Sequence, residues 1–202
     1  MSHAVLPPRR LILASTSRYR RELLSRLGLP FEAKAPDTPE LAIDGEAPAA
    51  MAARLALAKA RSIDIADALV IGSDQVASLD GQLLRKPGDH ATAVRQLQAC
   101  QGRTVFFDTA VAVIDTQTGA TLEHVDRTAV RFASLETAAL DRYVQREQPL
   151  DCAGSFKSEG LGVALFERID SRDPTALIGL PLIWLARALR ELGADPLGPT
   201  DS

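Results

Sequence analysis

The sequence predicts a single α/β domain built on a mixed sheet flanked by helices, and three observations lead to this fold class. Short apolar runs typical of buried strands alternate with helix-like stretches along the chain. Two longer strand-like stretches, residues 105–114 and 121–132, are joined by a turn-like segment and predict one antiparallel pair. With 202 residues, 46% of them hydrophobic, the chain is long enough to bury a substantial core.

The first elements follow from caps and apolar patterns. A strand at residues 11–14 ends in three hydroxyl residues that can cap the start of a helix over residues 18–27. Gly28 suits the position just past that helix. A second strand is expected at residues 31–35, and an Ala-rich helix is expected to begin at Pro48 and run to about residue 66.

The middle of the chain is expected to form a buried strand, a hairpin and a helix. Residues 68–72 are a short continuous apolar run, as in a strand covered on both faces, and Asp74 is expected just past its end. Asp80 and Gly81 indicate a short hairpin. Asp89 can cap a helix that reaches about Cys100.

The last part of the chain is expected to add two helices and a strand. Ser134 can cap a helix that ends before Pro149. Residues 161–169 are predicted to form a strand, and residues 182–192 an amphipathic helix. The domain is expected to span residues 11–194, between tails at residues 1–10 and 195–202.

Composition limits the classes of partner. A net charge of −3 and a pI of about 5.6 argue against bulk binding to nucleic acid. Cys100 and Cys152 stand far apart, which suits a reducing compartment. The longest apolar run, residues 176–186, is too short to span a bilayer, and residues 1–10 lack a signal-type core. We therefore expect a cytoplasmic protein without a nucleic-acid or membrane partner.

Three arginines stand where the first helix is expected to begin: Arg18, Arg20 and Arg21. Cations are unfavourable at a helix N-terminus, which already carries partial positive charge. A phosphate bound there would explain the cluster, and a solvated basic surface explains it equally well.

Asp74 is the leading candidate for chemistry, because ligands of open α/β sheets bind at the carboxyl ends of strands. A carboxylate there can bind magnesium or accept a proton, or it can simply cap a turn. Lys86, beside a Pro-Gly turn, could contact a phosphate or be merely exposed. The glycine-bracketed segment 153–160 suits a binding loop but matches neither a P-loop nor a dinucleotide fingerprint. Cys152 could act as a nucleophile only if a base lay near it.

Taken together, these segments resemble the Maf family of nucleotide pyrophosphatases. The matching segments run in family order from about residue 11 to residue 193 and are 11–17, 20–24, Glu40, 57–60, 72–74, 86–87 and 152–154. Segments 72–76 and 153–160 are similar to the YceF-type branch, whose activity is that of a 7-methyl-GTP pyrophosphatase. Branches that act on dTTP and UTP typically carry Thr and Gln where this chain has Gln75 and Glu159.

The chain departs from the branch pattern at a few positions. Arg18 and Tyr19 stand where the branch usually shows Pro-Trp, which keeps an aromatic ring of smaller area. Pro39 replaces an acidic residue beside Glu40, and Ala110 stands where glycine is common.

The resemblance implies two lobes around a central cleft, as in the related ITPase-like folds, and hydrolysis of a nucleoside triphosphate between the α and β phosphorus atoms. Arg20, Lys59 and Lys86 would bind the phosphates, and Ser15 would offer its hydroxyl or backbone N–H to a phosphate oxygen. Asp74 and Glu40 would bind a divalent cation, Mg²⁺ or alternatively Mn²⁺, and Asp74 is also the candidate proton acceptor. A homodimer is a further expectation from the family.

Selectivity is expected to come from Tyr19, Gln75 and Glu159. Methylation at N7 makes guanine cationic, so Tyr19 could stack on the base and Glu159 could accept from its N–H edge. Alternatively, Glu159 pairs with Lys157 or Arg168 for structural reasons. Two other functions stay open: a nucleotide-binding regulator of cell division without turnover, and a thiol hydrolase that uses Cys152.

Overall fold

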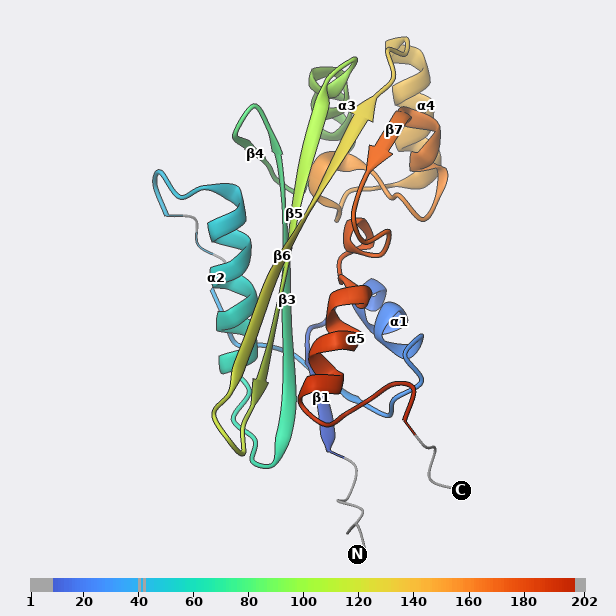
Figure 1. Ribbon diagram of the computed structural model, residues 1–202. Coiled ribbons are helices and arrows are strands. Elements are labelled where there is room, and N and C mark those ends of the chain that lie inside the picture. Colours follow the sequence, from blue (N-terminus) through green and yellow to red (C-terminus); the bar gives the residue numbers. More distant parts are fainter. Residues whose placement is uncertain (1–8, 40, 42, 199–202) are drawn as a thin grey trace, which may run out of the picture.

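The computed structural model describes residues 9–39, 41 and 43–198 and contains one seven-stranded mixed sheet (Figure 1). The sheet order is β2-β1-β3-β5-β6-β7, and β4 pairs with β3 outside this path. The strands are β1 (Arg10–Ala14), β2 (Glu32–Lys34), β3 (Ala68–Leu79), β4 (Gln82–Leu84), β5 (Thr104–Asp115), β6 (Thr121–Phe132) and β7 (Phe166–Asp170). The α/β class and the antiparallel pair β5–β6 are as the sequence predicts.

The helices divide the molecule into two parts joined by the long strands β3, β5 and β6 (Figure 1). One part contains α2 (Pro48–Arg61) on one face of the sheet, with α1 (Arg18–Ser25) and α5 (Leu182–Glu191) on the other. The second part contains α3 (His90–Cys100) and α4 (Thr137–Glu147) at the far end of the strands. The part with α3 and α4 has one apolar cluster, whereas the other part has clusters on both faces of the sheet, so the core is divided into several small units. No helix in the described ranges has the length and apolar character needed to cross a membrane.

Asp74 lies inside a strand, which corrects its expected place just past a strand end. The parallel neighbour β1 ends at Ala14, opposite Gly72, and β3 continues for seven more residues. The continuation is stabilised by antiparallel pairing with β5, from Gly72 with Ala112 to Ser78 with Phe106. The polar residues of β3 therefore begin where its parallel neighbour ends, and at this point the sheet edge is open for a ligand.

Residues 161–169 do not form the predicted continuous strand. The structure has a 3₁₀ helix, η2 (Leu161–Leu165), before β7. The backbone at Gly162 packs on residue 157, where a Cβ would lie 2.2 Å from the Lys157 carbonyl oxygen. A short apolar run is compatible with both a strand and a 3₁₀ helix. The packing of Gly162 against Lys157 selects the 3₁₀ helix, and the local sequence pattern does not reveal this contact.

Most other elements lie close to their predicted bounds. Asp89 caps α3 by accepting a hydrogen bond from the Thr92 backbone N–H, as predicted. The helix α2 ends at Arg61 rather than near residue 66, because Ile63 and Ile65 pack beside β3 and turn the chain back into the sheet. The helix α4 begins at Thr137, a few residues after the predicted cap.

Candidate active site

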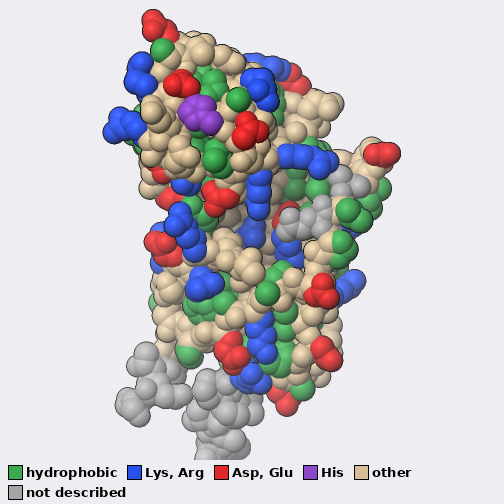
Figure 2. All heavy atoms as spheres, turned by 180° about the vertical axis from the view of Figure 1, so that it is seen from behind, with side chains coloured by type: hydrophobic (Ala, Val, Ile, Leu, Met, Phe, Trp, Pro, Cys, Tyr) green, Lys and Arg blue, Asp and Glu red, His purple; other side chains and the backbone are tan. Residues whose placement is uncertain are grey.

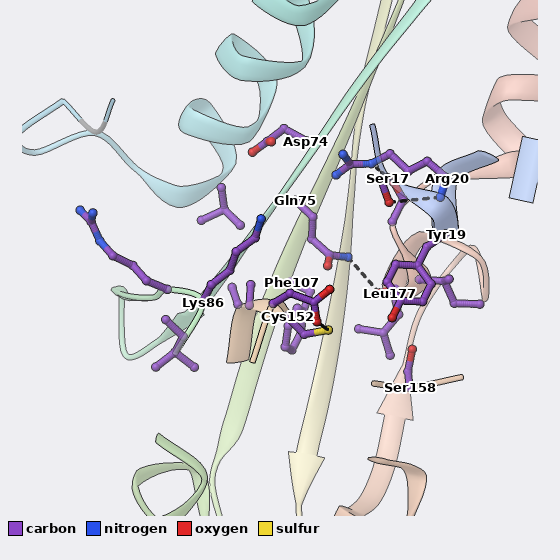
Figure 3. A pocket seen from close by; sticks show the side chains of 18 of the residues that line it. Ser17, Tyr19, Arg20, Asp74, Gln75, Lys86, Phe107, Cys152, Ser158 and Leu177 are labelled. Atoms are coloured by element: carbon purple, nitrogen blue, oxygen red, sulfur yellow. Dashed lines mark hydrogen bonds between the residues drawn. The ribbon is translucent and has the colours of Figure 1, made fainter. Parts of the chain in front are cut away.

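A cleft of about 430 Å³ lies between the two parts of the molecule. Figure 2 shows Lys and Arg side chains gathered around this hollow, and Figure 3 shows the cleft from close by. Its walls come from α1, α2, β3, β5, the end of β4, the loop after α4 and residues 177–179. The predicted site residues that line it are Tyr19, Arg20, Lys59, Asp74, Gln75, Lys86 and Glu159.

Asp74 and Lys59 form a buried ion pair at one end of the cleft. The Lys59 Nζ donates to the Asp74 Oδ1 at 2.6 Å, and the two residues are only 5% and 7% exposed. Gly72 makes this pairing possible, since a Cβ there would lie 2.1 Å from the carbonyl oxygen of Ala56 in α2. The missing side chain lets α2 approach β3, and that approach brings Lys59 to Asp74.

Among the clustered arginines, Arg20 lines the cleft, whereas Arg21 is exposed and does not. The Arg20 Nε donates to the Gly179 carbonyl oxygen at 2.9 Å, and the Ser73 hydroxyl donates to the same oxygen at 3.0 Å. Ser17 caps α1 through the Arg20 backbone N–H. The structure therefore separates the cluster: Arg20 faces the cleft, and Arg21 belongs to a solvated surface.

Gln75 holds the wall of the cleft in place. Its Nε2 donates to the Thr109 hydroxyl and to the carbonyl oxygens of Ala176 and Leu177, at 2.9 to 3.1 Å. The buried Thr109 hydroxyl also donates to the Ala176 carbonyl. The Gln75 amide nitrogen is thus engaged with protein, a positioning role that the sequence did not indicate.

The loop 151–160 is anchored to the helices behind it. The Ser155 hydroxyl contacts Gln96 of α3 at 2.6 Å, and the Lys157 Nζ donates to the Glu147 carbonyl of α4 at 2.8 Å. Its anchoring leaves Cys152, Ser158 and Glu159 on the cleft side.

The structural alternative for Glu159 is wrong. Lys157 pairs with Glu147, and Arg168 pairs with Asp170. Neither cation pairs with Glu159, which is exposed at the cleft and contacts the Ser158 hydroxyl.

Two predicted residues are placed elsewhere or not described. Ser15 is buried, its hydroxyl accepts from the Ser17 backbone N–H at 3.1 Å, and it does not line the cleft. Glu40 lies outside the described residues. The cleft adds four polar residues that were not predicted as site residues, although each lies in or beside a segment singled out in the sequence: Ser17, Arg85, Asp151 and Ser158.

The Cys152 thiol lines the cleft but is poorly suited to nucleophilic attack. Burial, together with the negative charge of Asp151, raises its pKa to about 12. A thiol with that pKa is protonated at neutral pH, whereas thiolate is the nucleophilic form. The raised pKa of Cys152 argues against the hypothesis of a thiol hydrolase.

The donor set suits magnesium better than a metal held by protein alone. The described ranges contain no group of three His, Cys, Asp or Glu side chains that could hold an ion. Mg²⁺ usually keeps several waters and binds through one or two carboxylates plus substrate phosphates. Asp74, a cleft carboxylate beside cations that can bind phosphates, fits that pattern.

Comparisons of sequence with known proteins agree on the family. The family model described as Maf-like protein matches residues 10–192. A protein of Albidiferax ferrireducens named 7-methyl-GTP pyrophosphatase is 53% identical over 94% of this chain and 96% of its own. One of Burkholderia lata with the same name is 56% identical over 94% and 93%. Among solved structures, the Staphylococcus aureus Ham1 protein matches 61% of this chain and 72% of its own, at 15% identity and a TM-score of 0.43.

Proposed function

The chain belongs to the Maf family, and from that membership we propose that it hydrolyses 7-methyl-GTP, or a related purine triphosphate, to the monophosphate and pyrophosphate. The observation that carries this proposal is the buried Asp74 carboxylate, placed in a cleft beside Lys59 and lined by further cations.

The phosphate end of the cleft neutralises the triphosphate. Phosphoryl transfer depends mainly on positioning and on electrostatic stabilisation of charge on the phosphate oxygens. Lys59 and Arg20 would act from fixed positions, because each is held by a hydrogen bond to protein. Lys86 and Arg85, at the end of β4, are exposed and can adjust to the ligand.

Asp74 would accept the proton of the attacking water, and its ion pair with Lys59 fixes the position of the carboxylate. Asp74 and Glu40 would also hold Mg²⁺ or Mn²⁺, which when bound polarises the scissile phosphoryl group. The rigid strand β3 and the buried Lys59 limit the movement of Asp74, which favours pre-organisation.

The base end would recognise a cationic purine. Tyr19 lines the cleft and offers a ring for stacking, and Glu159 is an exposed carboxylate on the same cleft. Cation–π attraction to a ring is worth roughly 0.5–2 kcal/mol, depending on desolvation. We expect Glu159→Gln to lower the preference for 7-methyl-GTP over GTP, measured as the ratio of their kcat/KM values. If Glu159→Gln and the wild type have the same ratio, Glu159 does not select the base.

The decisive experiment measures pyrophosphate release from a panel of triphosphates that includes methylated ones, with the products identified to locate the cleaved bond. Asp74→Asn should abolish release while nucleotide binding persists. Asp64→Asn makes the same charge change at an exposed position away from the cleft, and it should leave release unchanged. Binding by the wild type without divalent-cation-dependent release would contradict the proposal and favour the nucleotide-binding regulator.

A further inference from the structure

A carboxylate that sequence reasoning did not select lines the cleft next to Cys152. Asp151 is exposed on the loop after α4, and the Cys152 Sγ donates to its Oδ1 at 3.4 Å. Figure 3 shows Cys152 between Lys86 and Tyr19 in that view of the cleft. Asp151 and Tyr19 line the same cleft.

The two cleft-facing carboxylates of this loop, Asp151 and Glu159, are not tied to a described cation. Neither Asp151 nor Glu159 takes part in an ion pair with any described residue. The basic residues of the cleft wall come from α1, α2 and the end of β4 instead. The cleft therefore contains cations suited to phosphates on some walls and, on the loop 151–160, carboxylates that are not held in ion pairs with described residues.

Arg18 places a positive charge against the Tyr19 ring. Its guanidinium carbon lies 4.7 Å from the centroid of the Tyr19 ring, and it donates to the Tyr19 hydroxyl at 2.7 Å. One face of the ring is therefore covered by a cation, and a base can stack only on the other. A cation already in place weakens the attraction of the ring for a second cation.

Asp151 acts against that positive charge. The hydrogen bond to Tyr19 and, to a smaller extent, the charge of Asp151 hold the pKa of Arg18 above its ordinary value, so the field of Asp151 reaches the Arg18 guanidinium. Because Tyr19 lines the same cleft as Asp151, a ligand group bound beside the ring also lies within reach of this charge. A negative group there favours a positively charged base over a neutral one.

We propose that Asp151 is a specificity-determining residue, whose carboxylate offsets Arg18 and makes the base end of the cleft prefer a positively charged purine. The inference rests on the proposed function and deepens it, because the class of base is selected by charge. Since the carboxylate is exposed, the preference should be modest, about three- to eightfold, and should shrink at high salt.

The test compares the ratio of kcat/KM for 7-methyl-GTP to that for GTP in the wild type, Asp151→Asn and Asp64→Asn. Removing a negative charge helps any triphosphate to bind, and this effect cancels in the ratio. Asp151→Asn should lower the ratio about three- to eightfold. Asp64→Asn, with no contact to the cleft, should leave it unchanged. An unchanged ratio in a folded Asp151→Asn protein overturns the proposal.

Two further measurements separate charge recognition from a change of shape. Arg18→Gln should raise the ratio, because it removes the opposing cation. The preference should also fall at mildly alkaline pH, where 7-methylguanine loses its N1 proton and its net positive charge. A pH-independent preference, or a lower ratio in Arg18→Gln, contradicts selection by charge.

Binding of monophosphates keeps this inference distinct from the proposed function. Calorimetry with 7-methyl-GMP and GMP measures the same preference without turnover, so it gives a result even if the wild type releases no pyrophosphate. A preference for 7-methyl-GMP that Asp151→Asn reduces supports the inference on its own. Equal affinities for the two monophosphates, or no binding of either, overturn it.

Discussion

Substituting Gly72 by alanine tests the contact that brings α2 to the cleft. The added Cβ would lie 2.1 Å from the carbonyl oxygen of Ala56 and 2.6 Å from the backbone nitrogen of Ala60. Ordinary contacts begin at 3.4 Å, so α2 must retreat by about 1.3 Å from β3. Both atoms belong to helix backbone, which cannot rotate away as a side chain can. Lys59 lies between these residues and would move with them.

The expected cost follows from overpacking of a well-packed core, which typically destabilises by about 1–3 kcal/mol. We expect the upper part of that range, a free-energy loss of about 2–3 kcal/mol, because the obstacle is backbone. For a chain of this length, that loss lowers Tm by roughly 4–12 °C. Displacement of Lys59 relative to Asp74 should also lower kcat/KM on the order of 10- to 100-fold, as for other misplacements near 1 Å.

Urea denaturation and thermal unfolding measure the stability change, and pyrophosphate release measures the activity. Gly45→Ala is the matched control, because its Cβ meets nothing within 4 Å while its φ is +77°. The control should lose about 1 kcal/mol through backbone strain alone and keep full activity. A Gly72→Ala protein as stable as the wild type, or more stable, would refute the close packing of α2 on β3.

Two further predictions concern stability and the cleft wall. The Arg9 hydrogen bond holds the pKa of the Asp115 carboxyl well below its ordinary value. The ionised carboxylate therefore stabilises the fold above about pH 4, and this contribution is lost as the pH falls further. In urea titrations between pH 2 and 7, the free energy of unfolding of Asp115→Asn should vary less with pH than that of the wild type, and an equal variation would contradict this. Gln75→Leu should lower the free energy of unfolding by about 1–3 kcal/mol, because the Leu177 carbonyl loses its hydrogen-bond donor. It should also raise KM, because the cleft wall that contains Gly179 becomes less well held. An unaltered Tm would contradict this prediction.

The strands and the capped helices were accessible from the sequence because their signals are local. Asp89 stands three residues before its hydrogen-bond partner, and β5 and β6 are joined by a short turn. The conformation of residues 161–165 was not accessible, since it depends on the packing of Gly162 against Lys157. Local composition leaves such a run equally compatible with two conformations.

The residues that line the cleft were predictable as a set of residue types and not as a geometry. Asp74, Arg20 and Lys86 are reactive or charged residues that a resemblance can select. Their arrangement depends on contacts between residues about a hundred positions apart, such as Ser73 with Gly179. Asp151 carries no local signal either, because its relevance arises only where the loop 151–160 meets the cleft.

The placement of charge also explains how an acidic protein can bind a polyanion. A net charge of −3 gives no long-range attraction for a triphosphate, and salt near 0.15 M screens exposed charges beyond about 8 Å. Binding must therefore depend on cations inside the cleft, where Lys59 is buried and Arg20 is partly buried. Buried charges are screened less than exposed ones. Raising the salt concentration should consequently weaken the contributions of the exposed Lys86 and Asp151 before it weakens that of Lys59.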